Sequence, residues 1–276
     1  MGVAQWLASP GEPRQNLAVA LGMAERAAAL GVELLVLPEL WSCGYFPETL
    51  AVDARRDAEP LSGPRAQRLS EAARQHALFL AAGSVPERGD DGHLYDTALV
   101  FDPAGRLVAR HRKAHLYTPA LEHAVFTPDD QPEVARTLAR RGARLVLVPS
   151  ACEVERSSEW ELVHPALALV HGQWWVQANQ AGSFGSSTLL GASRIIAPTG
   201  TVVTAAGEAV PGLVSPAELV VHRIDLRLAA RPAGLAALLE AGRRPELYVA
   251  EPGPETKTDG AQPLGSVGPS TMSASP

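Results

Sequence analysis

Two ionisable residues occur where strands are expected to end, and their types could support acid–base chemistry. Leu34–Leu37 is an unbroken apolar run between Gly31 and Pro38, which is typical of a strand covered on both faces. Pro38 cannot donate a ladder hydrogen bond, so the strand should end there and present Glu39 at its carboxyl end. Open α/β sheets keep their chemistry at that edge. Glu39 is therefore a candidate general base; the alternative is a strand-end carboxylate that caps the following turn.

The second point of interest is the segment 111–117, which carries two histidines and two cations at the end of a predicted strand. Such a cluster can be a solvated charged face. His111 and His115 could also suggest a metal site, but no further ligand stands at suitable spacing, so we expect no metal and no other cofactor. Lys113 could instead compensate the charge of a buried glutamate and stabilise an oxyanion.

The elements that would position these residues follow from the apolar periodicity. Strands are expected at residues 3–7, 34–37, 78–84, 94–102, 107–112, 145–148, 174–178, 189–196, 201–205 and 219–225. Helices are expected at residues 16–30, 63–75 and 160–172, and from 226 to 241. Residues 41–63 are expected to form a long loop beside a pocket. Trp174 and Trp175 are adjacent on a strand and should point to opposite faces of it. The pattern indicates an α/β fold.

Composition narrows the class of protein. The 276 residues are 46% hydrophobic and 20% charged, with a net charge of -6, so neither nucleic acid nor an anionic membrane is expected as a partner. Cys43 and Cys152 are too few for a disulfide framework, and no secretory signal is visible, so a cytoplasmic location is expected. Residues 1–249 should form one domain. Residues 250–276 have almost no large apolar side chain and are expected to be a disordered tail.

Several short motifs occur in an order that resembles the nitrilase (carbon–nitrogen hydrolase) superfamily. The matching segments are residues 37–40 (LPEL), 44–45 (GY), 95–98 (YDTA), 105–106 (GR), 112–116 (RKAHL), 132–139 (PEVARTLA), 142–143 (GA), 148–151 (VPSA), 178–182 (ANQAG) and 191–200 (GASRIIAPTG). Each segment is weakly specific alone, but their combination is specific. The match extends from Val3 to about Tyr248.

The resemblance implies an α-β-β-α sandwich that forms a homodimer or a higher homo-oligomer. It also implies hydrolysis of a non-peptide C–N bond in a small-molecule amide or nitrile, most like the amidase branch. Members of the family use a glutamate base, a lysine that stabilises the tetrahedral intermediate and a cysteine nucleophile, and a second glutamate often supports the lysine. Glu39 matches the base, Lys113 the lysine and Glu122 the second glutamate.

The sequence departs from the family at the nucleophile. Counting back from Pro132 in the family register places the cysteine position on Phe126, and residues 126–131 contain no cysteine. A strand and its flanking loop, about 15–20 residues, are missing before Pro132. One central strand of the sandwich should therefore be absent. Its loss should expose unpaired backbone edges or force neighbouring strands to close the gap.

Three alternatives follow for function. Cys152, in the loop after the strand at 145–148, could serve as a surrogate nucleophile facing Glu39 and Lys113, although a small packed loop residue is the simpler interpretation. Cys43, in the loop after Glu39, is expected to be a packed structural residue. Without a nucleophile, the chain would be an inactive homologue that acts as a binding or assembly partner. The shortening could also be an error in the gene sequence of an ordinary hydrolase. We expect no release of ammonia from small amides.

Overall fold

The strands form two sheets that pack face to face. The computed structural model describes residues 1–130, 135–213, 215–230 and 237–238. The first sheet has the order β12-β1-β2-β3-β4-β5, in which β1, β2 and β3 are parallel and the other pairs antiparallel. Its strands are β1 (Gly2–Gln5), β2 (Leu34–Val36), β3 (Phe79–Arg88), β4 (Leu94–Phe101), β5 (Leu107–Arg112) and β12 (Glu218–Val221).

The second sheet has the order β11-β10-β7-β6, and β6 and β7 are parallel. Its strands are β6 (Leu145–Ser150), β7 (Trp174–Asn179), β10 (Arg194–Ile196) and β11 (Val202–Ala205). A separate antiparallel hairpin consists of β8 (Ala181–Phe184) and β9 (Ser187–Leu190).

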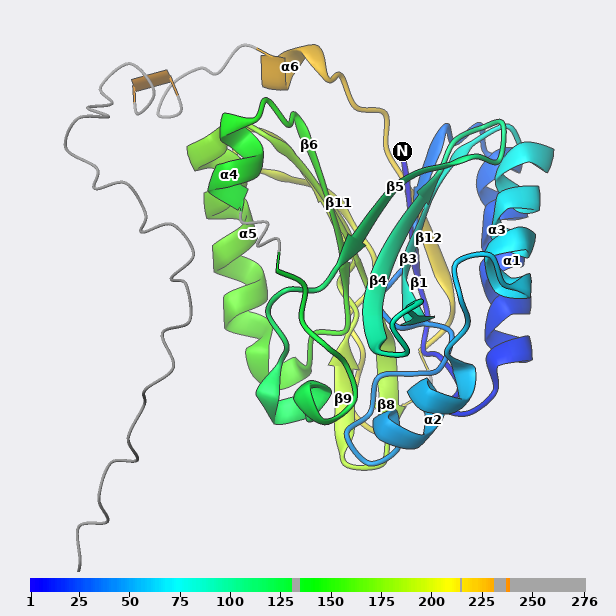
Figure 1. The fold of residues 1–276 in the computed structure, drawn as a ribbon. Coiled ribbons are helices and arrows are strands. Elements are labelled where there is room, and N and C mark those ends of the chain that lie inside the picture. Colours follow the sequence, from blue (N-terminus) through cyan, green and yellow to red (C-terminus); the bar gives the residue numbers. More distant parts are fainter. Residues whose placement is uncertain (131–134, 214, 231–236, 239–276) are drawn as a thin grey trace, which may run out of the picture. The chain divides into compact units, whose positions relative to one another are not determined.

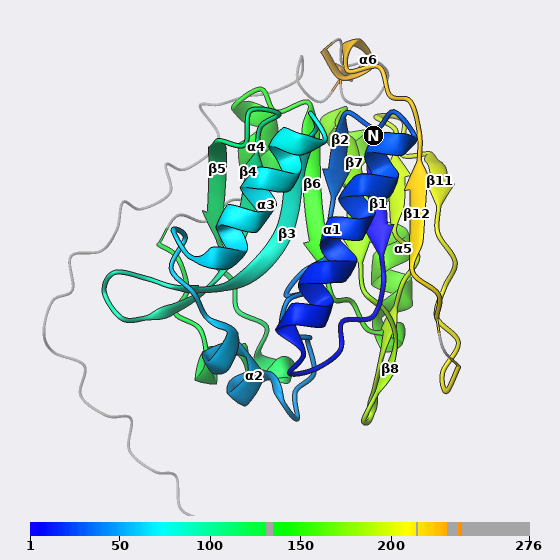
Figure 2. The same cartoon turned by 90° about the vertical axis from the view of Figure 1, so that its right-hand side faces the viewer.

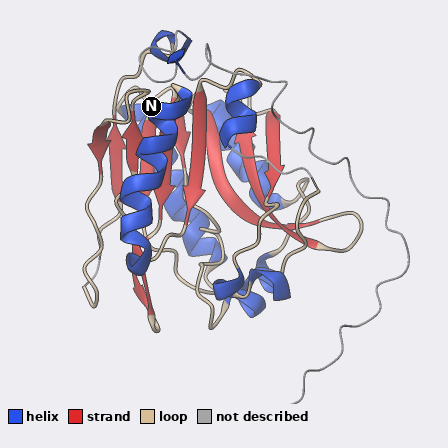
Figure 3. Cartoon of the chain, turned by 90° about the vertical axis from the view of Figure 1, so that its left-hand side faces the viewer, coloured by secondary structure: helices blue, strands red, loops and turns tan. Residues whose placement is uncertain are grey.

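Helices cover the outer face of each sheet (Figures 1 and 2). Helices α1 (Pro13–Ala29) and α3 (Pro64–Gln75) pack on the first sheet, and α4 (Ala135–Arg140) and α5 (Ser157–His171) pack on the second. The remaining short helices are α2 (Leu50–Asp57), α6 (Arg227–Ala230), η1 (Thr118–Ala120), η2 (Glu122–Ala124) and η3 (Val154–Arg156). A third apolar layer fills the space between the sheets. The architecture is the α-β-β-α sandwich that the sequence resemblance implies. Figure 3 shows the helices in blue and the strands in red.

Most predicted elements are confirmed, with three corrections. The long loop predicted at residues 41–63 contains helix α2, whose Leu50 and Ala54 are buried. The strand predicted at 189–196 is two strands, β9 and β10, and β3 runs on to Arg88. Trp174 packs between the sheets and Trp175 toward the helices, as predicted. The predicted tail and the domain boundary at 249 lie outside the described residues.

One end of the second sheet bears on the strand expected to be absent. Residues 113–130 contain no strand, and within the described part of the chain β6 is the last strand of its sheet, paired only with β7. The unpaired backbone edge predicted from the sequence is therefore present, and neighbouring strands have not closed it. None of the described helices combines the length and the apolar character needed to cross a bilayer.

Candidate active site

Glu39 lies where the carboxyl ends of three strands meet. It follows β2 after Leu37 and Pro38, and its backbone N–H donates to the carbonyl oxygen of Ser150 at the end of β6 (3.3 Å). The carbonyl of Glu39 accepts a hydrogen bond from Nε2 of Gln180, which follows β7 (2.8 Å). The backbone of Glu39 is thus connected to both sheets, which fixes the position from which its side chain extends.

A bulge in β3 supports the turn that carries Glu39. The register of β3 against β4 shifts between Ala81 and Ser84. Gly83 has φ +62°, and a Cβ on it would lie 1.8 Å from the carbonyl oxygen of Pro38. Ser84 then bonds both sides of Glu39: its N–H donates to the Pro38 carbonyl (3.2 Å), and its Oγ accepts the N–H of Leu40 (3.1 Å). Bulges often direct side chains beside functional sites.

Lys113 follows β5 directly and reaches across to Glu39. Its backbone N–H donates to the carbonyl of Asp96 on β4 (2.9 Å). Its Nζ lies 2.7 Å from Oε1 of Glu39 and 2.7 Å from Oε1 of Glu122. Burial lowers the pKa of Lys113, but the charges of Glu39, Asp96 and Glu122 outweigh it, and the net pKa is raised. The side chain is therefore a fixed cation at neutral pH.

Glu122, at the start of η2, is fully buried and satisfied. Its Oε1 accepts the hydroxyl of Tyr45 (2.7 Å) as well as the Lys113 ammonium, and its Oε2 accepts the N–H of Tyr117 (2.6 Å). Burial, followed by the charges of Glu39 and Glu122, raises the pKa of Tyr45, so the phenol stays protonated and acts as a donor. Charge-assisted bonds of this kind make the buried carboxylate tolerable.

Asp96 completes a group of three carboxyl groups around the ammonium. Oxygens of Glu39, Asp96 and Glu122 lie within 4.8 Å of one another. Burial, and then the charge of Glu39, raise the pKa of Asp96 well above its usual range, which favours the neutral acid. Lys113 Nζ lies 4.0 Å from Asp96 Oδ2 and bonds the other two carboxylates. This group is occupied by the protein's own cation. His111 and His115 are not part of it.

Neither thiol joins this network. Cys43 is buried, its Sγ donates to the carbonyl of Gly44 (3.3 Å), and burial raises its pKa well above the usual range. Cys152 is half-buried, and its Sγ contacts the carbonyl of Glu153 (3.7 Å). Among the described residues, neither sulfur bonds Glu39 or Lys113. Burial raises the pKa of Cys152 to about 11.

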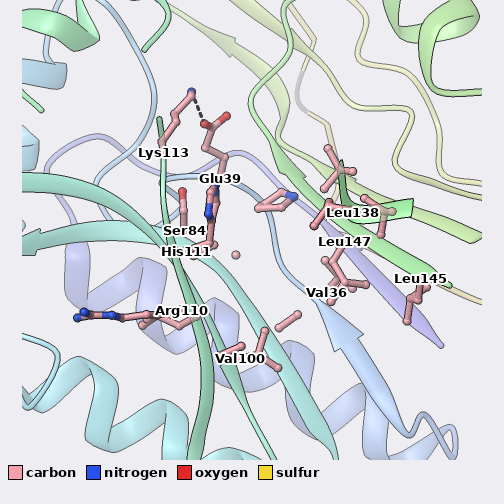
Figure 4. Close-up of a pocket in the computed structure, with 18 of the residues that line it drawn as sticks. Val36, Glu39, Ser84, Val100, Arg110, His111, Lys113, Leu138, Leu145 and Leu147 are labelled. Carbon is pink, nitrogen blue, oxygen red and sulfur yellow. Dashed lines mark hydrogen bonds and ion pairs between the residues drawn. The ribbon is translucent and has the colours of Figure 1, made fainter. Parts of the chain in front are cut away.

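Two hollows meet at the Glu39–Lys113 pair. The first, here called the cysteine cavity, has a volume of about 330 Å³, and besides the pair it is lined by Tyr45, His115, Tyr117, Cys152, Arg156 and His164. The second, here called the sheet cavity, has a volume of about 540 Å³ and lies beside β6 (Figure 4). Its apolar lining includes Val36, Ala81, Val100, Leu138, Leu145 and Leu147. Both volumes are in the range of small-molecule sites.

The structure brings together Glu39, Lys113 and Glu122, the three residues that the sequence singled out. It places Cys152 in the same cavity but outside their hydrogen-bond network. Sequence reasoning gave no role to Tyr45 or Asp96, although both lie within the family-like segments. A signal for them existed: Tyr45 lies in the matching segment directly after that of Glu39, and Asp96 lies opposite Lys113 in the predicted hairpin.

Comparison with known proteins shows the family of this chain. The sequence profile described as carbon-nitrogen hydrolase matches residues 2–230. The chain is 29% identical over 241 residues to omega-amidase NIT2 of Xenopus tropicalis, covering 75% of this chain and 84% of that protein. It is 30% identical over 226 residues to omega-amidase NIT2 of Mus musculus, covering 70% and 79%.

Solved structures of an amidase from Nesterenkonia sp. AN1 are also similar. A cysteine-to-alanine mutant in complex with butyramide gives a TM-score of 0.69 at 29% identity, covering 79% of this chain and 87% of that chain. A glutamate-to-glutamine mutant, with the acetamide moiety of fluoroacetamide added covalently at its active-site cysteine, gives 0.73 at 28% identity, covering 89% and 94%.

Proposed function

Because this chain belongs to the carbon–nitrogen hydrolase family, we propose that its Glu39–Lys113 site binds a small amide but does not hydrolyse it through a thiol. One observation carries the proposal. Lys113 is held 2.7 Å from each of two glutamates, while no described thiol bonds either member of the Glu39–Lys113 pair. These contacts support binding of an amide by the Glu39–Lys113 pair, and they do not support attack on it by a thiol.

The pair suits an amide group chemically. The Lys113 ammonium can donate to an amide oxygen, and a carboxylate can accept an amide N–H. Oε2 of Glu39 has no hydrogen bond to a described residue and is available for this purpose. The cysteine-to-alanine mutant of the Nesterenkonia amidase forms a complex with butyramide, and the cysteine cavity, at about 330 Å³, has room for a molecule of that size.

Hydrolysis by the family's chemistry requires a thiolate. With a pKa of about 11, Cys152 would be ionised in only about one molecule in ten thousand at pH 7. Cys43 is further excluded, because it is 1% exposed and does not line the cysteine cavity. The site therefore lacks an activated nucleophile.

A second candidate function has an observation in its favour, because Cys152 lines the same cavity as Glu39 and Lys113. If Glu39 took the proton of Cys152, the sulfur could attack the amide carbon while Lys113 stabilised the oxyanion. Ammonia would leave with a proton returned by Glu39, and water would then hydrolyse the thioester. In that case the chain would be an amidase with a displaced nucleophile.

Butyramide separates the two functions. We expect saturation-transfer NMR to detect binding to the full chain, weakened by Glu39→Gln and unchanged by Glu33→Gln, which alters an exposed residue before β2. A coupled assay should detect no ammonia above the blank. Ammonia release that is lost in Cys152→Ala and kept in Cys43→Ala would overturn the proposal and make Cys152 the nucleophile. If butyramide does not bind, the proposal of an amide-binding site at Glu39 and Lys113 is contradicted.

A further inference from the structure

The backbone of β6 presents alternate residues to an open side. Trp174 donates its N–H to the carbonyl of Arg144 (2.9 Å), and Gln180 donates to that of Ser150 (3.3 Å). In a parallel ladder these two bonds fix the parity, so the even-numbered residues of β6 face β7. Leu145, Leu147 and Pro149 therefore direct their backbone groups away from it. Pro149, which has no N–H, stands on the open side, where a proline costs no ladder bond.

The composition of β6 does not suit an edge. Leu145–Val148 is a continuous apolar run of the kind found in strands with a neighbour on each side. Its partner β7 is buried at every residue, whereas in β6 only Val146 is buried. Edge strands are usually short, charged or covered. Within the described residues, nothing pairs with this edge.

The sheet cavity adjoins the open edge. Figure 4 shows Leu138, Leu145 and Leu147 on one wall, and Val100 and His111 on the other. The facing strand β5 is exposed over Leu107–His111 and half-buried only at Arg112, so that wall is uncovered as well. Glu39 and Lys113 also line the sheet cavity, so the cavity reaches the Glu39–Lys113 pair.

We propose that the open edge of β6 and the sheet cavity form a docking site for one extended polypeptide strand with alternating apolar residues, supplied by a partner protein. The outward N–H groups of Leu145 and Leu147 and the carbonyls of Leu145, Leu147 and Pro149 would bond its backbone, as in strand addition to a sheet edge. Every second side chain of the strand would enter the cavity.

A flexible partner strand fits these features better than the other occupants. A small apolar molecule would fill the cavity but leave the row of backbone donors and acceptors unused. A second copy could pair its β6 with this edge, but that strand's side chains are already committed to its own cavity and would leave this one unfilled. The occupant must supply backbone groups that pair with the edge of β6 and also side chains that fill the sheet cavity.

The probe is a fluorescent peptide of about ten residues that alternates Val and Thr, with a Lys at each end. We expect it to bind the full chain in fluorescence anisotropy. Two further peptides carry N-methyl groups on all Val or on all Thr residues, which block opposite edges of the strand. Exactly one of them should lose binding. Equal binding by both would mean simple apolar insertion and would overturn the proposal.

Two variants of β5 give a matched control on the protein. Ala109 lines the cavity, and Val108 is 52% exposed and does not. Ala109→Trp should weaken peptide binding by about tenfold or more, and Val108→Trp should leave it unchanged. Equal effects would contradict the site. Circular dichroism and Tm confirm that both variants fold.

Hydrogen exchange followed by NMR reads the edge directly. In the free protein the amides of Leu145 and Leu147 should exchange faster than those of Val146 and Val148, and the peptide should slow only the first pair. Exchange that is unchanged by saturating peptide would overturn strand addition. A dimer in sedimentation that protects Leu145 and Leu147 and resists the peptide would show that a second copy occupies the edge, against the proposal.

Discussion

Lys113 and Glu122 form an ion pair of 2.7 Å in which the carboxylate is fully buried. A buried carboxylate is stable only when its hydrogen-bonding capacity is used. Here Lys113, Tyr45 and the Tyr117 backbone each donate to it. The orientation of Lys113 toward Glu39 therefore depends on groups that are far apart in the sequence. Tyr45 and Glu122, for example, are 77 residues apart.

Tyr45→Phe should destabilise the protein, because it removes one donor from the buried carboxylate of Glu122. We expect a loss of about 1–2 kcal/mol in the free energy of unfolding, measured with urea. Tyr95→Phe is the matched control: Tyr95 donates to Asp91 (2.6 Å), and Asp91 is exposed to water, so its loss should cost less. Equal losses would show that the Glu122 network is not held by Tyr45.

Gly83→Ala should disturb the turn that carries Glu39. A Cβ there would lie 1.8 Å from the Pro38 carbonyl oxygen, so the backbone must move, and φ +62° adds strain. We expect a loss of about 3 kcal/mol or more in unfolding free energy, together with weaker butyramide binding. Gly92→Ala also has a positive φ, but its Cβ would meet nothing within 4 Å. It should cost about 1 kcal/mol and leave binding intact. Similar effects at the two positions would contradict the proposed support of Glu39.

His164 should contribute a pH dependence to stability. Burial, and then the charge of Arg194, lower its pKa from 6.5 to about 4. Its Nδ1 lies 2.5 Å from Nε2 of Gln177, whose amide donates to the neutral ring. Below pH 6.5 the unfolded chain binds a proton on this residue that the folded chain does not. Its contribution to stability is therefore present above pH 6.5 and is lost as the pH falls toward 4.

The difference between wild type and His164→Asn isolates this contribution from the carboxylates that titrate in the same range. Unfolding free energies measured between pH 7 and 4 should fall more steeply for the wild type. A ring that titrates by NMR near pH 6.5 in the folded protein would contradict the buried, neutral state.

Much of the site could be predicted because its signals are local. The apolar run that ends at Pro38 located Glu39, and the hairpin before residue 113 located Lys113. The order of short motifs located Glu122 and revealed the shortened centre of the chain. These features depend on neighbouring residues, which a single sequence displays.

The rest depends on distant contacts. Helix α2 lies where the sequence predicts a loop, because half of its residues, LAVDARRD, are charged. Its Asp57 is nevertheless buried and bonded to Ser42 and Arg65 (both 2.5 Å), partners that no periodicity shows. The position of the Cys152 sulfur was equally beyond prediction, because it depends on how Asn179 and Leu190 hold that loop: Cys152 donates its N–H to Asn179 Oδ1, and its carbonyl accepts the N–H of Leu190 (both 2.8 Å).

The most direct test of the central claim is the reaction of the full chain with fluoroacetamide at pH 7, followed by intact mass and peptide mapping. A glutamate-to-glutamine mutant of the Nesterenkonia amidase carries the acetamide moiety of this reagent at its active-site cysteine, so the reagent reports a reactive thiol in a site of this kind. The account predicts that Cys152 and Cys43 stay unmodified in the wild type, as the alanine does in a Cys152→Ala control. An adduct on Cys152 of the wild type that is absent from Cys152→Ala would contradict it.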